Sequence, residues 1–319
     1  MKDFTITIVG TGVIGTSIGL ALKQMNEPPQ LIAHDKELST SKAAVAQGAF
    51  DKADWNLINA CEKADLLILA LPLDGVAPTL KAIAPDLKQN VVVTDTTRHA
   101  VATAEIAAQL LPETAHFIGG NPIVIPTGTG HERAHAKLFE GRPYCLTPSP
   151  KASEEAIQLV VGLVSLLGAE PFFLDPTEHD GFVTIVEQLP TLLGVALLNT
   201  VARESSWRET RKFAGQLFEQ TTAGISHQPE TIKENLRAND LLNLWLGRYI
   251  KQLQSLQTML STPAEESDPA LLKLIEQAVT DRNNWLADYE QGRFVDPELL
   301  PPDNLEHPGF MKRWIGIGS

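Results

Sequence analysis

The sequence is poor in cysteine, in aromatic residues and in positive charge. Only two of its 319 residues are cysteines, aromatic residues make up 6%, and 26 lysines and arginines stand against 39 aspartates and glutamates, giving a net charge of −13. Two cysteines are too few to cross-link a chain of this length, so Cys61 and Cys145 are expected to be free thiols in a reducing compartment. The acidic balance argues against a protein that binds nucleic acid or anionic membranes through a basic surface.

The sequence also lacks a secretory signal and a clean membrane-spanning run. Met1–Phe4 leads directly into a strand-like segment, without a basic region followed by an apolar one. The longest apolar stretch, Phe182–Ala202, contains Glu187 and Pro190, which is more typical of a helix buried in a bundle than of a membrane span. We therefore expect a cytoplasmic protein without a membrane partner.

The first half of the chain alternates short, apolar, β-branched runs with helical patterns. Runs that are apolar throughout, such as Leu66–Leu71, are typical of strands covered on both faces. This alternation predicts an α/β domain with a parallel sheet over residues 1–175. The expected strands are Thr5–Val9, Gln30–His34, Leu66–Leu71, Val91–Thr94, His116–Gly119, Pro143–Pro150 and Pro171–Leu174, and the expected helices are Ile14–Met25, Ser41–Gln47, Gly75–Ile83, Val101–Leu110 and Glu154–Leu167.

The second half reads as an all-α domain over residues 176–294, followed by an irregular tail over 295–319 that is rich in proline and glycine. Helical periodicity covers Phe182–Arg203, Trp207–Gln220, Pro229–Arg237, Leu241–Leu260 and Pro269–Gln291. One of these helices carries an apolar stripe that fits either an intrachain core or a second subunit, and the sequence leaves both open. The stripe consists of Leu241, Leu242, Leu244, Trp245, Tyr249 and Leu253.

A glycine-rich turn joins the first expected strand to the first expected helix. Its sequence, Gly10-Thr11-Gly12-Val13-Ile14-Gly15, has the spacing of a dinucleotide-binding turn in the context that makes this spacing informative. Gly10 allows the tight turn, Gly12 lets a diphosphate approach the backbone, and Gly15 lets helix and strand pack closely. The free N–H groups of the helix N-terminus favour the phosphate charge. The domain is therefore predicted to be of Rossmann type.

Two further segments belong to the same expected cofactor site. Asp35 follows the second strand by one residue, where a carboxylate binds the adenosine ribose and repels a 2′-phosphate, so NAD is favoured. The neighbouring Lys36 leaves NADP possible. Leu71 and Pro72 follow the next central strand at the carboxyl edge of the sheet, where a bound dinucleotide would lie against them.

The order of these pieces resembles the prephenate/arogenate dehydrogenase family. The resemblance covers residues 4 to about 260 and implies a Rossmann domain followed by a helical dimerisation domain, hence a homodimer formed through the helical domain. It also implies oxidative decarboxylation of a small anionic substrate in tyrosine biosynthesis, with hydride passing to NAD(P)+. The matching stretches are the Gly10–Gly15 turn, Ala70-Leu71-Pro72, Val93-Thr94-Asp95, Leu110-Leu111-Pro112, Phe117–Pro122, Leu138–Tyr144 and Leu189-Pro190.

The chain departs from this family where substrate chemistry takes place. The family's proton-accepting histidine falls at Asn121, whose amide is no base near neutral pH. The family's serine after the Asp95 strand falls at Arg98. The His-Leu-Pro-His motif becomes Gln188-Leu189-Pro190-Thr191, and the Thr-Arg pair of the helical domain falls at Thr222-Ala223.

Candidate replacements lie close to these departures. Arg98 would hold a substrate carboxylate, since a guanidinium binds two oxygens at once. His99 or His131 would supply a new base, because imidazole titrates near neutrality. The alternative is that Arg98 and His99 merely begin a solvated helix. Arg98, His99 and Asn121 are the candidate catalytic residues.

Two patterns that suggest metal binding are interpreted as incidental. His131-Glu132-Arg133-Ala134-His135 has the H-E-x-x-H spacing of a zinc helix, but it follows glycines in a linking segment without an apolar helix around it. The run Glu265, Glu266 and Asp268 before Pro269 is expected to be a solvated turn, since it lacks the spacing of a calcium loop. No metal is expected.

Three hypotheses for function remain open at this stage. The chain is a dehydrogenase of tyrosine biosynthesis with an unusual site, a dehydrogenase acting on a different anionic substrate, or a dinucleotide-binding regulator without catalytic activity. The first is the preferred interpretation.

Overall fold

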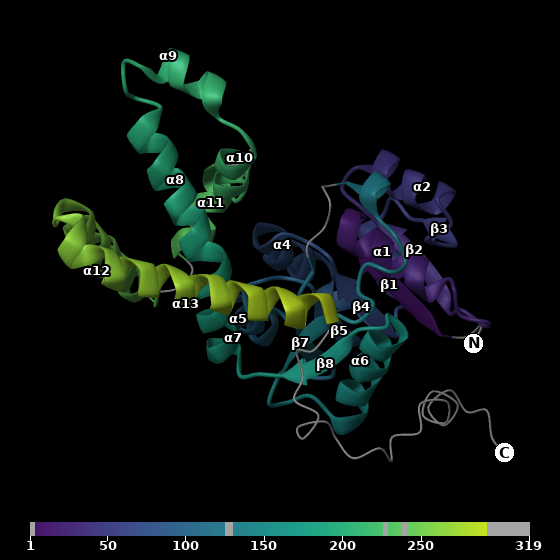
Figure 1. The fold of residues 1–319 in the computed structure, drawn as a ribbon. Helices are drawn as coiled ribbons and strands as arrows, with labels where there is room; N and C mark the ends of the chain where they lie inside the picture. Colours follow the sequence, from purple (N-terminus) through teal and green to yellow (C-terminus); the bar gives the residue numbers. More distant parts are fainter. Residues whose placement is uncertain (1–3, 125–129, 226–228, 238–240, 292–319) are drawn as a thin grey trace. The chain divides into compact units, whose positions relative to one another are not determined.

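The computed structural model describes residues 4–124, 130–225, 229–237 and 241–291, so the predicted tail over 295–319 lies outside the described residues. The chain divides into two compact units. One is Met1–Pro176 together with the segment from Tyr289, and the other is Thr177–Asp288. The first unit is an α/β domain, and the second is built from helices (Figure 1).

The α/β unit contains one eight-stranded sheet with the strand order β3-β2-β1-β4-β5-β6-β7-β8. The crossover from β3 to β4, on the other side of β1, reverses the direction in which the sheet grows. In such sheets ligands bind at the carboxyl ends of the strands beside that reversal. The strands are β1 Thr5–Val9, β2 Gln30–His34, β3 Lys52–Ala53, β4 Leu66–Leu69, β5 Val92–Asp95, β6 His116–Pro122, β7 Pro143–Pro148 and β8 Glu170–Phe173.

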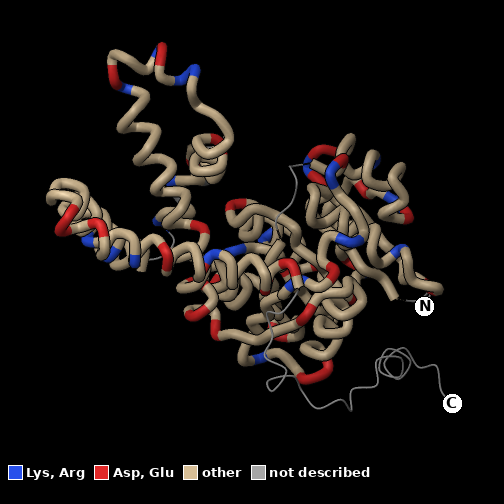
Figure 2. Tube along the Cα trace, viewed as in Figure 1, with Lys and Arg blue, Asp and Glu red and all other residues tan. Residues whose placement is uncertain are grey.

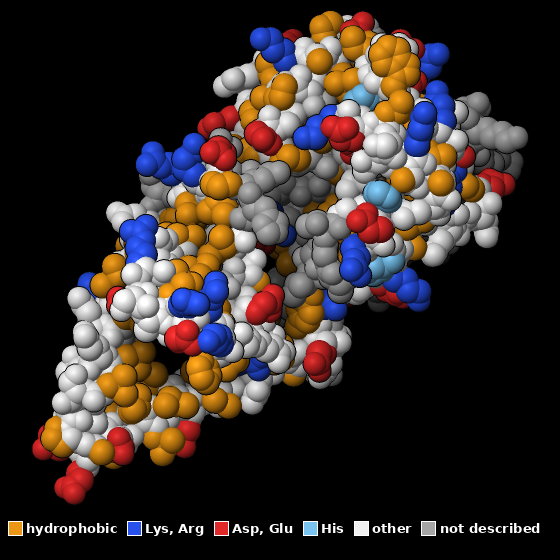
Figure 3. Space-filling view, turned by 90° about the horizontal axis from the view of Figure 1, so that it is seen from above, with side chains coloured by type: hydrophobic (Ala, Val, Ile, Leu, Met, Phe, Trp, Pro, Cys, Tyr) orange, Lys and Arg blue, Asp and Glu red, His pale blue; other side chains and the backbone are white. Residues whose placement is uncertain are grey.

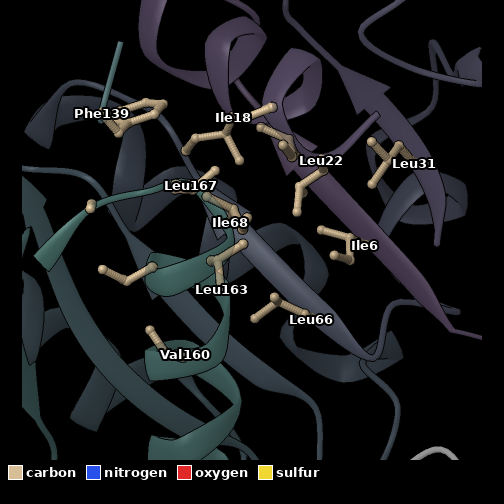
Figure 4. Close-up of a cluster of buried hydrophobic side chains, with 14 of the residues drawn as sticks. Ile6, Ile18, Leu22, Leu31, Leu66, Ile68, Phe139, Val160, Leu163 and Leu167 are labelled. Carbon is tan, nitrogen blue, oxygen red and sulfur yellow. The ribbon is translucent and has the colours of Figure 1, made fainter. Parts of the chain in front are cut away.

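Helices cover both faces of this sheet, because strand side chains alternate between two apolar clusters. One cluster combines strand residues with α1, α2 and α6, and Figure 4 shows Ile18 and Leu22 of α1 and Leu163 of α6 beside Ile68 of β4. The other cluster joins the opposite strand faces to α3, α4 and α5. The helices are α1 Val13–Leu22, α2 Leu38–Ala46, α3 Leu57–Cys61, α4 Leu73–Ile83, α5 Ala100–Leu110 and α6 Glu154–Leu166.

The structure corrects the expectation of a fully parallel sheet. Strands β1 to β6 run parallel, but β7 pairs antiparallel with β6, and β8 is parallel to β7. The chain reaches β7 from β6 through residues 123–142 without an α-helix among the described ones. Without a helical crossover, a neighbouring strand can enter from the opposite direction. The short elements β3 and α3 were not predicted, since two and five residues carry too little periodicity.

The helical unit confirms the predicted helical class but not every boundary. The expected helix Trp207–Gln220 is instead two short helices, α9 and α10, separated by a 3₁₀ turn. The predicted turn at Glu265, Glu266 and Asp268 is wrong, because α13 begins at Ala264 and carries Pro269 within its first two turns. The elements are α7 Pro176–Val183, a π-helical turn Thr184–Gln188, α8 Leu189–Val201, α9 Trp207–Thr210, α10 Gln216–Thr222, α11 Pro229–Arg237, α12 Leu241–Ser261 and α13 Ala264–Gln291.

Many apolar side chains of the helical unit are exposed in the described part of the chain. The continuous helical stretch Pro176–Val201 is long and apolar enough to cross a membrane. The sequence predicted a helix buried in a bundle, but only 28% of the most apolar part of this stretch is buried. In the predicted stripe on α12, Leu242 is buried whereas Leu244 and Leu253 are about half exposed. Figure 3 shows hydrophobic side chains at the surface of this unit. Exposed apolar area of this extent is typical of an interaction site.

Charged side chains are distributed along the chain rather than gathered. In the described part of the chain, acidic and basic positions are scattered over the helices and loops of both units (Figure 2). The tube shows no continuous basic band among these residues. The lack of a basic band among the described residues agrees with the net charge of −13.

Candidate functional site

The glycine turn closes over the end of β1 and is fixed from both sides. Gly10 donates its N–H to the carbonyl of His34 at 2.8 Å, and its φ of +97° is a left-handed conformation that favours glycine. A Cβ on Gly10 would lie 2.2 Å from the carbonyl oxygen of Ala70. Gly10 is therefore required by the protein's own packing.

The other two glycines of the turn differ sharply in their surroundings. A Cβ on Gly15 would lie 2.0 Å from the backbone oxygen of Gly10, so Gly15 is also required for packing. A Cβ on Gly12 would meet nothing within 4 Å, and Gly12 has an ordinary φ of −70°. Nothing among the described residues requires glycine at position 12, and Gly12 is exposed, so the backbone of the turn is open at this point.

Asp35 is bound directly to this turn. Its Oδ2 accepts hydrogen bonds from the backbone N–H and the hydroxyl of Thr11 at 2.8 and 3.0 Å, and its Oδ1 accepts one from the N–H of Glu37 at 3.0 Å. A carboxylate offers about four lone-pair sites, so Oδ1 keeps one for a further donor such as a ribose hydroxyl. The neighbouring Lys36 is exposed. Asp35 thus shapes the turn and carries negative charge beside it.

The sequence-predicted residues of the cofactor site converge at one edge of the sheet. Val13 and Ile14 form the first turn of α1, whose leading N–H groups have no intrahelical acceptor, as at any helix N-terminus. Leu71 lies against the turn, since its Cδ2 would be 3.1 Å from a Cβ on Gly10. Pro72 is exposed and precedes α4 as its N-cap residue. The turn, the acid and this loop form a cradle whose open side is the backbone at Gly12, and a dinucleotide diphosphate fits this arrangement.

A second group of polar residues lies where β5 and β6 end. Asp95 is 1% exposed, and its Oδ1 accepts the N–H of Gly120 at 2.9 Å. Its Oδ2 accepts the N–H and the hydroxyl of Thr97 at 3.1 and 2.6 Å. One buried carboxylate therefore holds the residue before Arg98 beside the residue before Asn121. The role of Asp95 was not predicted, although a buried acid at the end of an apolar strand was a visible signal.

The three candidate catalytic residues lie at this edge of the sheet and differ in how exposed they are. Arg98 is exposed, His99 is 7% exposed and is the N-cap residue of α5, and Asn121 is 4% exposed within β6. Asn121 faces Cys145 across the antiparallel β6–β7 pair. The connection through Asp95 places the segments that carry them side by side.

The H-E-x-x-H segment does not form the helix that a zinc site needs. His131–Arg133 is a single 3₁₀ turn, so the two histidines do not share one face of an α-helix. His131 Nδ1 lies 3.4 Å from a carboxylate oxygen of Glu132, and the backbone N–H of His135 donates to the Ser17 hydroxyl at 3.0 Å. Among the described residues, no group of three or more histidine, cysteine, aspartate or glutamate side chains is placed to hold a metal.

In the helical unit, the positions of the missing family histidines lie on the π-helical turn and on α8. Gln188 is 5% exposed and accepts a hydrogen bond from the Thr184 hydroxyl at 3.1 Å. Thr191 donates its own hydroxyl to the carbonyl of Glu187 at 2.8 Å. Thr222 ends α10 and Ala223 follows it. Local π-helical backbone is frequent at functional sites, so this turn marks a candidate substrate-facing segment of the unit.

Both cysteines are buried, and neither forms a disulfide. Burial and the nearby Asp54 carboxylate raise the pKa of the Cys61 thiol to about 12, so this thiol stays protonated at physiological pH. The predicted free thiols are confirmed.

Two family models match the chain in succession. The nucleotide-binding domain of prephenate dehydrogenase matches residues 18–172, a range that begins after the glycine turn, and the dimerization domain of prephenate dehydrogenase matches residues 175–277. The matched ranges meet at the boundary between the two compact units.

Individual relatives agree with these matches. The prephenate dehydrogenase of Bacillus subtilis is 26% identical over 99% of this chain and 85% of its own length. The cyclohexadienyl dehydrogenase of Zymomonas mobilis is 24% identical over 81% of this chain and 88% of its own length. Among solved structures, Synechocystis arogenate dehydrogenase superposes with a TM-score of 0.71 at 28% identity, covering 88% of this chain and all of that one. Aquifex aeolicus prephenate dehydrogenase has a TM-score of 0.76 at 21% identity, covering 89% of this chain and all of that one, and shows the shared fold.

The glycine turn, the order of the strands and the two successive domain matches lead to one assignment. The chain belongs to the prephenate dehydrogenase family.

Proposed function

We propose that this protein is an NAD-dependent dehydrogenase that oxidises and decarboxylates an anionic cyclohexadienyl hydroxy acid of the prephenate or arogenate class. The observation that carries the proposal is the contrast within the turn, where Gly10 and Gly15 are needed for packing and Gly12 is not. When bound, NAD+ supplies the hydride acceptor. The residues Gly10 to Gly15, Asp35, Leu71 and Pro72 would hold it.

Arg98 is the proposed anchor for a substrate carboxylate. It is exposed at the carboxyl edge of the sheet, two residues before α5 begins, so its guanidinium and the positive end of an 11-residue helix favour an anion at the same place. The Asp95 connection holds this segment against β6. Arg98 would thereby restore the binding of a substrate carboxylate, which the chain lacks at the positions where the family's residues are substituted.

His99 is the proposed acceptor of the substrate's hydroxyl proton. Asn121 has an amide that can hydrogen-bond the hydroxyl but cannot take its proton. His99 stands in the segment that Asp95 connects to Gly120, whereas the turn containing His131 lies with α1 and α2. Transfer of the proton to His99 as hydride leaves the ring carbon would accompany loss of carbon dioxide.

Removing the Asp35 carboxylate should lower the preference for NAD+. In Asp35→Ala we expect NAD+ affinity to fall about tenfold or more, since a charged hydrogen bond to the ribose is lost. NADP+ should lose less, because repulsion of its 2′-phosphate disappears as well. Titration calorimetry with both dinucleotides measures the ratio.

The control for this experiment is Thr11→Val, which deletes the hydroxyl bond to Asp35 but keeps the charge. It should weaken both dinucleotides equally. An unchanged ratio of affinities in Asp35→Ala would show that this carboxylate does not meet the ribose.

Absorbance at 340 nm tests the proposed reaction directly, using prephenate, arogenate and related carboxylates with NAD+ and NADP+ separately. Arg98→Ala should raise the KM for the carboxylate that is turned over about tenfold to hundredfold, because this is the usual effect of losing a charge-assisted hydrogen bond. The KM for NAD+ should stay unchanged.

Lys63→Ala is the matched control, because Lys63 is an exposed cation before β4, at the opposite edge of the sheet. A normal KM in Arg98→Ala would mean that Arg98 is only a surface residue. NAD+ binding without turnover of any carboxylate would favour a regulatory protein over an enzyme.

We further propose that the protein is a cytoplasmic homodimer joined through the helical unit. The exposed apolar side chains of that unit, among them Val186 at 67% and Leu217 at 82%, support a covering partner copy, and the two free thiols support a reducing compartment. Sedimentation equilibrium should give twice the 34.7 kDa chain mass at micromolar concentration. A mass of one chain would contradict the homodimer.

A further inference from the structure

Trp55 is an exposed aromatic residue at the edge of the nucleotide-binding unit. Its side chain is 72% exposed, and it is the only tryptophan among residues 4–176. An exposed tryptophan offers a large rigid ring with a polar N–H at little cost in conformational entropy when it binds. Its place in the fold suggests what it contacts.

Asp35 and Trp55 follow β2 and β3, which are neighbouring parallel strands. Strands β2 and β3 lie beside each other in Figure 1. In this parallel pair, Ile32 lies opposite Lys52 and Ala33 opposite Ala53. The pairing continues past β3, since the N–H of Asp54 donates to the carbonyl of Ala33 at 2.9 Å.

One further contact joins the ends of the two strands. The carbonyl of Asp54 lies 2.9 Å from His34 Nδ1. Asp35 is the first residue after β2 and Trp55 the second after β3, so the two residues leave neighbouring parallel strands at the same carboxyl edge of the sheet. The proposed ribose site and this tryptophan are neighbours at the same carboxyl edge.

The turn that carries Trp55 is held by hydrogen bonds on both sides. Asp54 Oδ1 accepts the N–H of Asn56 at 3.0 Å, and Asn56 caps α3 by accepting the N–H of Asn59 at 3.1 Å. The contact to His34 connects the same turn to β2. The backbone at Trp55 is thus preorganised and need not be ordered when a ligand arrives.

We propose that Trp55 is a nucleobase-binding residue that stacks against the adenine of the bound dinucleotide. This inference rests on the proposed function, because adenine is joined to the ribose that Asp35 would bind. An aromatic face beside a ribose-binding carboxylate suits a purine, whose π-face stacks on tryptophan irrespective of its hydrogen-bonding groups. Trp55 would then contribute affinity for the adenosine half and none for the nicotinamide half.

Calorimetry with ADP-ribose, which lacks the nicotinamide, tests the stacking. Trp55→Ala should weaken ADP-ribose about fivefold to hundredfold, the usual range for one base–aromatic stack, and Trp55→Phe should retain most of the affinity. Wild-type affinity in a folded Trp55→Ala protein would overturn the proposal.

Fluorescence gives a second readout that a merely structural role would not produce. ADP-ribose should quench tryptophan emission in the wild type and in Trp285→Phe, a control at a 52% exposed tryptophan of the helical unit. The quenching should disappear in Trp55→Phe although ADP-ribose still binds. Quenching that persists in Trp55→Phe would contradict stacking at this residue.

These outcomes remain distinct from a failure of the proposed function. If the wild-type protein bound neither ADP-ribose nor NAD+, the cofactor site itself would be wrong, and the adenine contact with it. If the wild type bound both and Trp55→Ala bound them equally well, the cofactor site would stand and only the role of Trp55 would be refuted.

Discussion

Gly12→Ala should reduce NAD+ affinity at least about tenfold, or 1.4 kcal/mol, while the unliganded protein unfolds at nearly the same temperature. The added methyl group meets no protein atom within 4 Å, so the free energy of unfolding should change by no more than about 1 kcal/mol. The same methyl group occupies the place where the diphosphate must approach the backbone. Calorimetric titration and thermal unfolding of the unliganded protein measure the two effects separately.

Gly15→Ala is the matched control with the opposite pattern. Its methyl group would lie 2.0 Å from the backbone oxygen of Gly10, so the chain must shift, and we expect about 3 kcal/mol of lost stability. Any loss of NAD+ binding in the Gly15→Ala variant would follow from this damage to the fold. If Gly12→Ala bound NAD+ as tightly as the wild type, the turn would not be the diphosphate site.

His99→Gln should lower kcat by a factor of about 10² to 10⁴, the usual contribution of a positioned proton acceptor. Adding Asn121→His in the same protein returns an imidazole to the end of β6 and should restore part of the rate. Steady-state kinetics between pH 6 and 9 follow both changes.

The control for the base is His131→Gln, which alters the other candidate histidine and should leave kcat unchanged. The KM for NAD+ should stay constant in all of these variants, which separates a chemical effect from a binding effect. A normal kcat in His99→Gln would remove His99 from the mechanism. An altered kcat in His131→Gln would assign the proton to the histidine of the 3₁₀ turn instead.

The sequence was most informative about elements whose pattern is local. The strands Thr5–Val9 and Gln30–His34 were predicted to the residue, because the first is a short β-branched run and the second has a short apolar centre that lies between two prolines and Asp35. The direction of β7 was not predictable, since a strand looks the same from either end and only the pairing partner decides its direction. The expected helix Trp207–Gln220 is interrupted before Gly215, the N-cap residue of α10, and the apolar periodicity used to predict the helix takes no account of such a glycine.

The same distinction holds for the candidate site. The glycines and Asp35 could be found because a diphosphate turn imposes a fixed spacing on one continuous segment. Asp95 contacts Gly120, which is 25 residues away along the chain, so its connecting role exists only in the folded protein. Trp55 likewise comes to the same sheet edge as Asp35 only through the pairing of β2 with β3, a short strand that the sequence did not reveal.

A crystal structure of the protein grown with NAD+ tests the central claim most directly. We predict electron density for the diphosphate against the backbone N–H groups at Gly12 and Val13, with a ribose hydroxyl on the free side of Asp35 Oδ1. Density for NAD+ elsewhere, or a cradle left empty at saturating NAD+, would contradict the account.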